Sequence, residues 1–194
     1  GTFAKSTFAI TSAGSLTMSG GDLTSTSGAV IVTGAVNISS ALSAIDFGSE
    51  AWTVSSTWTN ASTDGTVWEA GTGTVTFDSA TGGTMTFAGA NLAEAEFNNV
   101  TFNSSAGTTQ TFTMASRGLS WSGTLTISGD TILAKATFTL GAEASGALTV
   151  GGAGANALMS TSGAVTVTTV SIFGTSDYID LGSESWSVSG TWTN

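Results

Sequence analysis

DFGSEAWTVSSTWTN (residues 46–60) returns near the end of the chain as DLGSESWSVSGTWTN (residues 180–194). Eleven of the fifteen aligned positions are identical. Self-similarity at a long, nearly constant offset is the sequence signature of a repeat architecture. A tandem repeat is therefore the first structural expectation for this chain.

Two further matches extend the repeat towards the amino terminus. STSGAV at residues 25–30 recurs identically at residues 160–165. AKSTFAI at residues 4–10 resembles AKATFTL at residues 134–140. The offset between the copies differs slightly from one match to the next, and small insertions and deletions in turns explain this drift.

These matches divide the chain into two units. Residues 1–130 form one full unit, and residues 131–194 form the first half of a second unit that is continuous with the first. The chain begins at Gly1 and stops partway through the second unit. We expect a piece of a longer protein, or a protein whose next half-unit comes from a neighbouring copy.

Within each unit, short runs alternate between small or polar residues and large apolar ones, bounded by Gly, Ser, Asn or Asp. Alternation with period two predicts a half-buried β-strand, and the bounding residues predict turns. No stretch has the helical period, so we predict almost no helix. The runs are TFAI at residue 7, SLTM at 15, AVIV at 29, AVNI at 35, TVTF at 74, TMTF at 84, NVTF at 99, TFTM at 111, TLTI at 124, TFTL at 137, ALTV at 147 and AVTV at 164.

Each run predicts one apolar face and one hydroxyl-bearing face. In TVTF, Val75 and Phe77 share one side of the strand and point inward, while Thr74 and Thr76 point outward. Threonine suits an exposed strand face because it is β-branched and polar without being charged. The same reasoning places five further pairs outward: Thr84/Thr86, Thr111/Thr113, Thr124/Thr126, Thr137/Thr139 and Thr166/Thr168.

Many evenly spaced strands are compatible with two all-β architectures. One is a β-solenoid, a parallel β-helix of stacked coils, and the other is a chain of tandem β-sandwich domains, one for each unit. We favour the solenoid because the chain has no proline, few charged residues and a tandem repeat. Coils of about 20 residues, stacked about 4.8 Å apart, predict roughly ten coils.

The composition excludes several classes of function. Charged residues make up 8% of the chain, against about 25% in a typical soluble domain. Without His and Cys the chain has no Ser-His-Asp or Cys-His nucleophile system, no Cys/His zinc site and no thiol chemistry. Three basic residues (Lys5, Arg117 and Lys135) and a net charge of −10 argue against nucleic acid as a partner. No apolar run is long enough to insert into a membrane, and no residue pattern requires a cofactor.

Several stretches resemble the repeats of large bacterial secreted and surface-anchored β-helix proteins, including autotransporter-like adhesins. They are WTVSSTWTN, GTGTVTFDSATGGTMTF, FNNVTFNSSAGTTQTF and SGTLTISGDTILAK. The resemblance covers most of the chain and rests on composition. It implies an extracellular, parallel β-helical stalk and brings no catalytic residues with it.

The repeated tryptophans are the most conspicuous side chains. Trp52 and Trp58 share strand parity and recur as Trp186 and Trp192. An uninterrupted strand points all four inward, which predicts a structural aromatic layer. A sugar-stacking platform and a contact between subunits are the alternatives.

Two groups of acidic residues are candidate sites. Glu94 and Glu96 are expected to point outward, about 6.6 Å apart, which is a separation suited to inverting glycosidases; plain solvation is the simpler explanation. The pairs Asp46/Glu50 and Asp180/Glu184 recur in Gly-Ser turns, where carboxylate oxygens could bind calcium. Their spacing matches neither an EF-hand nor an RTX-type nonapeptide loop.

The only two lysines, Lys5 and Lys135, occupy equivalent positions in the repeat. Their spacing from Phe8 and Phe138 predicts that they point outward. There they would limit pairing at a sheet edge. A covalent Lys–Asn crosslink is the alternative.

The outward Thr-x-Thr pairs resemble those of ice-binding β-solenoids. Ice binding requires the pairs to form one regular column. The six pairs begin at residues 74, 84, 111, 124, 137 and 166, and this irregular spacing argues against such a column.

The sequence as a whole favours a structural role. We expect a rod-like solenoid that contributes to an extracellular or cell-surface fibre, stalk or filament and associates end to end with copies of itself. A glycan-binding adhesin module is the main alternative. An enzyme acting on polysaccharide and an ice-binding protein are weaker ones.

Overall fold

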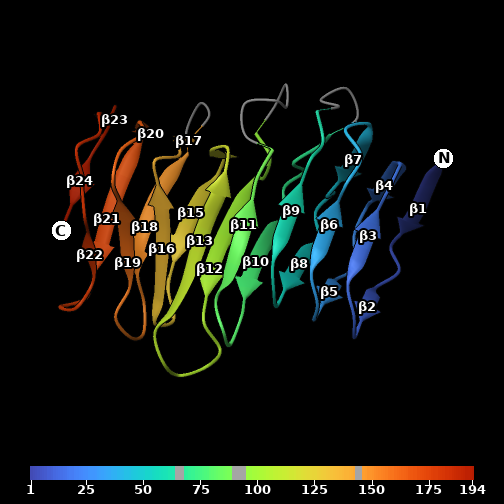
Figure 1. Cartoon of the computed structure of the whole chain (residues 1–194), viewed down its shortest axis with the longest axis horizontal. Helices are drawn as coiled ribbons and strands as arrows, with labels where there is room; N and C mark the ends of the chain where they lie inside the picture. Colours follow the sequence, from blue (N-terminus) through green and yellow to red (C-terminus); the bar gives the residue numbers. More distant parts are fainter. Residues whose placement is uncertain (64–67, 89–94, 143–145) are drawn as a thin grey trace.

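The computed structural model describes residues 1–63, 68–88, 95–142 and 146–194. Within these residues the chain is all-β, without a helix, and every strand pairing is parallel. The chain winds into stacked coils that advance from one end of the molecule to the other (Figure 1). The prediction of a β-solenoid is confirmed.

The longest sheet contains one strand from every passage of the chain along that side. Its nine strands, in spatial order, are β2 (Ile10–Ser12), β5 (Val30–Val32), β8 (Ala51–Val54), β10 (Thr74–Asp78), β12 (Asn99–Asn103), β15 (Thr124–Ile127), β18 (Ala147–Gly151), β21 (Thr169–Phe173) and β24 (Trp192–Thr193).

The second side is an eight-stranded sheet. In chain order its strands are β3 (Leu16–Met18), β6 (Val36–Ile38), β9 (Trp58–Asn60), β11 (Gly83–Thr86), β13 (Gln110–Ser116), β16 (Thr131–Ala136), β19 (Ala157–Ser160) and β22 (Tyr178–Ile179).

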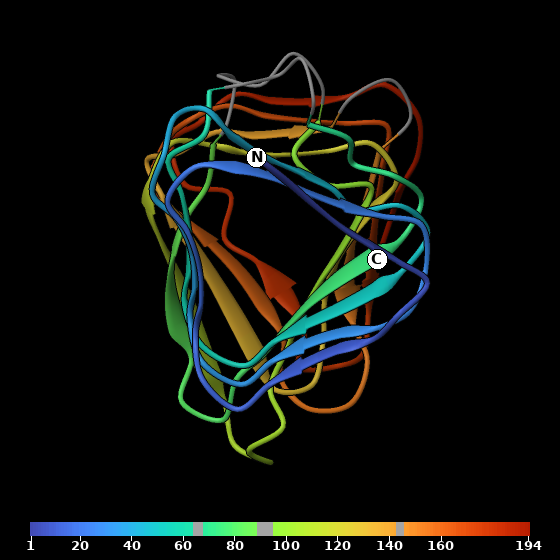
Figure 2. The ribbon, with the colours of Figure 1, turned by 90° about the vertical axis from the view of Figure 1, so that its right-hand side faces the viewer.

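The third side is split between two sheets. At the amino-terminal end it holds β1 (Thr2–Ser6), β4 (Gly21–Ser25) and β7 (Ser43–Asp46), and at the carboxy-terminal end β14 (Leu119–Trp121), β17 (Leu140–Ala142), β20 (Val165–Val167) and β23 (Trp186–Val188). Isolated bridges Asp46–Glu69 and Phe97–Trp121 mark the same side in the intervening coils. Seen end-on, the three sides enclose a common interior (Figure 2).

The interior is filled by the alternate residues of each strand. In β10, Val75 and Phe77 are buried, while Thr74 and Thr76 are partly exposed. Neighbouring strands place identical residues side by side: Val75 lies beside Val100, and Phe77 beside Phe102. The rings of Phe77 and Phe102 are stacked, with their centroids 5.0 Å apart. The core is therefore a set of columns that run along the axis, with each layer burying the one before it.

The coils are longer than the sequence suggested, and they number about eight rather than roughly ten. Their lengths also differ: Ile10 has Val30 as its ladder partner on the next coil, whereas Val75 has Val100, which lies further along the chain. Neither of these two pairings has a register shift, so the difference in coil length arises between the paired strands. Coil number therefore depends on corner length, which strand periodicity does not report.

Ten of the twelve predicted strand runs match observed strands over most of their length. The two exceptions, residues 7–10 and residues 137–140, occupy equivalent places in the repeat. In both, a strand ends at the residue preceding the run, and the next begins at the last residue of the run, Ile10 or Leu140. Most of each run is therefore a corner turn.

The two copies of the repeat lie on different sides of the solenoid. Strand β2, from the first copy, belongs to the nine-stranded sheet, whereas its sequence equivalent β17 belongs to the four-stranded sheet. Likewise β3 lies in the eight-stranded sheet and its equivalent β18 in the nine-stranded sheet. One repeat unit thus spans a whole number of coils plus a further fraction, so equivalent strands shift by one side.

Candidate functional site

A buried ion pair joins three successive coils at one corner. Lys5 Nζ, on the first coil, lies 2.6 Å from Glu50 Oε2, on the third, and both side chains are inside the protein. Ser25, on the coil between them, donates its hydroxyl hydrogen to the same carboxylate oxygen. We call Lys5, Ser25 and Glu50 the first clamp. Its ammonium also donates to three carbonyl oxygens, those of Phe8, Ser27 and Gly28, at 3.0, 2.7 and 2.8 Å.

The second copy of the repeat builds the same arrangement, the second clamp. Lys135 Nζ lies 3.1 Å from Glu184 Oε2, and Ser160 donates to that oxygen. Burial lowers the pKa of Lys135, while the hydrogen bond and the charge of Glu184 oppose the shift. Three carbonyl oxygens again complete the cation's surroundings, those of Phe138, Ser162 and Gly163, at 3.0, 2.7 and 2.9 Å.

The prediction that Lys5 and Lys135 point outward is wrong. Each is followed by a residue in the left-handed conformation, Ser6 at φ 54° and Ala136 at φ 51°, where the ladder register also shifts. This corner resets the alternation, so Phe8 lies outside, at 76% exposure. Each lysine nitrogen lies inside the corner, among three carbonyl oxygens and a glutamate, so neither is placed to limit pairing at a sheet edge.

The hypothetical calcium ligands do not converge. Glu50 turns inward to the first clamp, and Glu184 to the second. Asp46 and Asp180 accept hydrogen bonds from the backbone of Gly48 and Gly182, two residues on, as turn-forming aspartates do. Among the described residues no group of three or more His, Cys, Asp or Glu side chains could hold a metal ion.

The four repeated tryptophans have two different environments. Trp52 and Trp58 are fully buried, and Phe47 packs against both rings. Trp186 is half-buried, whereas Trp192, which was expected inside, is 43% exposed. The rings of Trp186 and Trp192 contact each other at a centroid distance of 5.6 Å. Trp52 and Trp58 therefore have no free ring face for a sugar, and the exposed pair belongs to the last coil.

The aromatic layer contains a buried carboxylate that the sequence placed outside. Glu96 is fully buried. Its Oε1 accepts hydrogen bonds from the Trp58 indole at 3.2 Å and the Asn60 amide at 2.7 Å, and its Oε2 accepts one from the Ala88 backbone at 2.9 Å. The outward prediction for Glu96 is wrong because the residue lies in a corner segment and not on a strand. Glu94 lies outside the described residues, and Glu96 is not placed to reach a polysaccharide.

The indole nitrogens show how the two clamps differ. Trp52 donates to Glu50 Oε1 at 2.7 Å, completing the hydrogen bonds of that carboxylate. The equivalent Trp186 donates instead to the backbone oxygen of Leu181 at 3.4 Å, and Glu184 Oε1 has no hydrogen-bond partner. The carboxylate of the second clamp thus has one oxygen without a hydrogen-bond donor.

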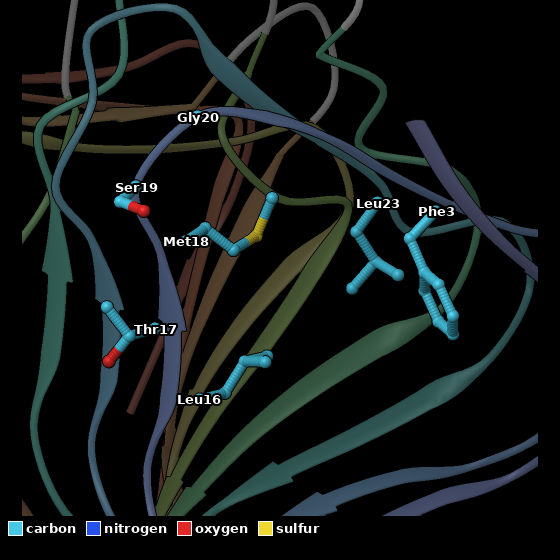
Figure 3. A pocket seen from close by; sticks show the side chains of 7 residues that line it. All are labelled: Phe3, Leu16, Thr17, Met18, Ser19, Gly20 and Leu23. Carbon is cyan, nitrogen blue, oxygen red and sulfur yellow. The ribbon is translucent and has the colours of Figure 1, made fainter. Parts of the chain in front are cut away.

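The amino-terminal end of the stack has a cavity inside the first coil. Its volume is about 280 Å³, and Figure 3 shows Phe3, Leu16, Met18 and Leu23 around it. Strands β1, β2 and β3 each pair with one neighbour, as do β22, β23 and β24 at the opposite end. Both ends of the described stack therefore carry apolar side chains and a free strand edge.

The six Thr-x-Thr pairs are distributed over all three sides. Thr74/Thr76 and Thr124/Thr126 lie on the nine-stranded sheet, and Thr84/Thr86 and Thr111/Thr113 on the eight-stranded sheet. Thr166 is on β20, and Thr139 lies just before β17, both on the third side. The pairs themselves therefore form no single column.

Comparison with known proteins finds no matching family model, no matching curated protein and no matching solved structure. A search of the described residues for a helix long and apolar enough to cross a membrane also finds none. Functional inference therefore rests on the geometry of this chain.

Proposed function

We propose that this chain is a structural segment of an extracellular rod that grows by the stacking of coils on its ends. One observation carries the proposal. Trp186 and Trp192 of the last coil are partly exposed, while Trp52 and Trp58, their equivalents in the first copy, are sealed by the coil that follows them. The last coil thus presents a surface that the same sequence buries elsewhere in the chain.

The hydrogen bonds of the last coil support the same proposal. A buried acceptor without a donor costs about 1–3 kcal/mol, and Glu184 Oε1 is in that state. In the first copy the corresponding oxygen is satisfied by Trp52. A coil packed over Trp186 would press its indole inward, where its N–H could donate to Glu184 Oε1.

The amino-terminal end offers a complementary surface. Phe3, at 62% exposure, and Leu23 border the apolar cavity of the first coil (Figure 3). The unpaired edge of β1, β2 and β3 can accept parallel strands from a second chain by strand addition. Because the two end surfaces differ, their association is head-to-tail, and stacking along the rod axis extends the rod without closing a ring.

The extracellular location is the second part of the proposal. It rests on the compositional resemblance to secreted β-helix proteins and on the low content of charged residues. The continuous parallel ladders suit a stalk, because they join each coil to its neighbours along the rod.

Sedimentation velocity and negative-stain microscopy over a concentration series test the assembly. We expect the purified chain to form rods that lengthen with concentration, and we expect Trp192→Ser to shorten them. Leu42→Ser is the matched control, since Leu42 is equally apolar and 72% exposed but lies in a corner of the second coil, away from the core. A chain that remains monomeric at high concentration, or rods shortened equally by both variants, would overturn the proposal.

A further inference from the structure

One side of the solenoid carries an ordered column of threonines that the linear sequence conceals. The column occupies five consecutive strands of the nine-stranded sheet, which follow one another along the axis in Figure 1. In each strand the threonine lies between two buried core residues, so its side chain points to solvent. The ladder register aligns Thr53, Thr76, Thr101, Thr126 and Thr149, each directly beside the next.

A second outward column runs beside the first, two residues earlier on each strand. Thr74 pairs with Ala51 on one side and with Asn99 on the other, and Thr124 pairs with Ala147. Strand geometry separates neighbouring groups by about 4.8 Å along the stack and about 6.6 Å along each strand. We call these two columns the threonine face.

The threonine face is uncharged. Among all the residues of the nine strands, the one charged residue is Asp78, at the end of β10, and it accepts a hydrogen bond from the Asn103 amide at 3.4 Å. Neither column contains an aromatic ring. The face therefore lacks the charges that bind anions or cations and the rings on which sugars stack.

The hydroxyl groups of the central column are available to solvent. Among the described residues, none of these five side chains makes a hydrogen bond within the protein, whereas Thr33 and Thr63 donate to carbonyl oxygens of the preceding coil at 3.2 and 3.3 Å. A β-branched side chain has few rotamers, so the five threonines of the column have few orientations available. The hydroxyl and methyl groups of the central column thus form a regular line, flanked by the uncharged side chains of the second column.

We propose that the threonine face binds the surface of ice. Ice presents an uncharged, periodic array of hydrogen-bond donors and acceptors, and a rigid array of hydroxyl and methyl groups can order water in the same periodic manner. Because the backbone is held by ladders and threonine side chains have few rotamers, adsorption costs little conformational entropy. Charged side chains would hold their own hydration shells against the ice lattice, and this face has none in either column.

The proposal is independent of end-to-end stacking, because the threonine face lies along the side of the rod. The irregular spacing of the Thr-x-Thr pairs along the sequence does not exclude this column, because the column is formed by register between coils. Thr53, Thr101 and Thr149 belong to no Thr-x-Thr pair, yet register places them in line with Thr76 and Thr126.

Ice-affinity partitioning and ice-recrystallisation assays with the purified chain test the proposal. We expect the chain to be enriched in slowly grown ice and to inhibit recrystallisation, and we expect Thr101→Tyr to reduce the enrichment by about tenfold, since a ring at the centre of the array prevents contact with a flat lattice. Thr113→Tyr is the matched control, because Thr113 is exposed on the eight-stranded sheet. Circular dichroism and the thermal midpoint establish that both variants fold.

Three results would overturn the proposal. The first is no enrichment of the wild-type chain in ice, and the second is an equal loss in the two tyrosine variants. The third is retention on insoluble cellulose or chitin at room temperature that Thr101→Tyr abolishes, without any effect on ice; the face would then bind a crystalline polysaccharide.

Discussion

Lys5 Nζ lies 2.6 Å from Glu50 Oε2, although the two residues are far apart in the sequence and belong to the first and third coils. The contact exists because both coils turn the same corner, and Ser25 on the middle coil bonds to the same carboxylate. A buried ion pair adds little stability compared with apolar residues at both positions. Loss of one partner, however, leaves an unpaired charge in the core. The main effect of the clamp is therefore to favour the arrangement in which these three corners lie above one another.

We expect Lys5→Met to lower the free energy of unfolding by about 3–5 kcal/mol, because Glu50 then keeps a buried charge without its cation. Replacing both residues by methionine should cost less than the single change. Urea unfolding followed by circular dichroism measures both. Arg117→Met is the control, since Arg117 is exposed and its loss should change stability by no more than about 0.5 kcal/mol. If Lys5→Met behaves like the control, Lys5 faces solvent and the clamp does not form.

Glu96→Gln should destabilise the middle of the rod by about 1–3 kcal/mol. The carboxylate accepts hydrogen bonds from Trp58, Asn60 and the Ala88 backbone, and an amide would turn an NH₂ group towards one of these donors. The emission of the buried tryptophans should shift as well. Glu69→Gln is the matched control because Glu69 is exposed. Equal stability of the two variants would contradict the buried position of Glu96.

Gly73→Ala should cost about 1–3 kcal/mol through overpacking. A Cβ at residue 73 would overlap the backbone oxygen of Glu50 on the preceding coil, and neither backbone can move without breaking the ladder. Gly141→Ala is the control, since a Cβ there meets no atom within 4 Å. Thermal unfolding compares the two variants, and an unchanged midpoint for Gly73→Ala would show that the corners stack less closely than described.

Iodide should quench only part of the tryptophan fluorescence of the dilute chain. Four of the six tryptophans are buried (Trp52, Trp58, Trp68 and Trp121), whereas Trp186 and Trp192 are reachable. Replacing the last two by phenylalanine should remove most of the quenchable signal. Assembly into rods should protect them, so the quenchable fraction should fall as concentration rises. A quenchable fraction that does not change with concentration would argue that the last coil stays uncovered.

Local residue pattern was sufficient to predict the all-β solenoid and ten of the strands that the structure describes. Val75 and Phe77 must share a side of their strand whatever surrounds them, because the pleat alternates side chains with period two. Together with the tandem repeat, this alternation predicted strands that stack in successive coils. It also placed the outward threonines of each strand correctly on the solvent side of the sheets, as Thr76 and Thr126 illustrate.

The rule fails where the chain turns. Ser6 and Ala136 adopt positive φ and shift the register, so parity counted across them assigns Lys5 and Lys135 to the wrong side. Glu96 lies in a corner as well, and its inward position depends on donors from Trp58, Asn60 and Ala88. Corner conformation is decided by what packs inside it, which a strand period does not contain.

The sequence by itself determined the all-β class, the repeat and the inward and outward faces of residues within uninterrupted strands. Only the tertiary structure decided which residues become neighbours between coils: about eight turns, two buried clamps, a repeat whose copies lie on different sides, and one aligned column of threonines. The physical reason is that each strand alternates independently of the others. Their alignment depends on burying apolar columns across corners of unequal length, and that condition exists only once the coils are stacked.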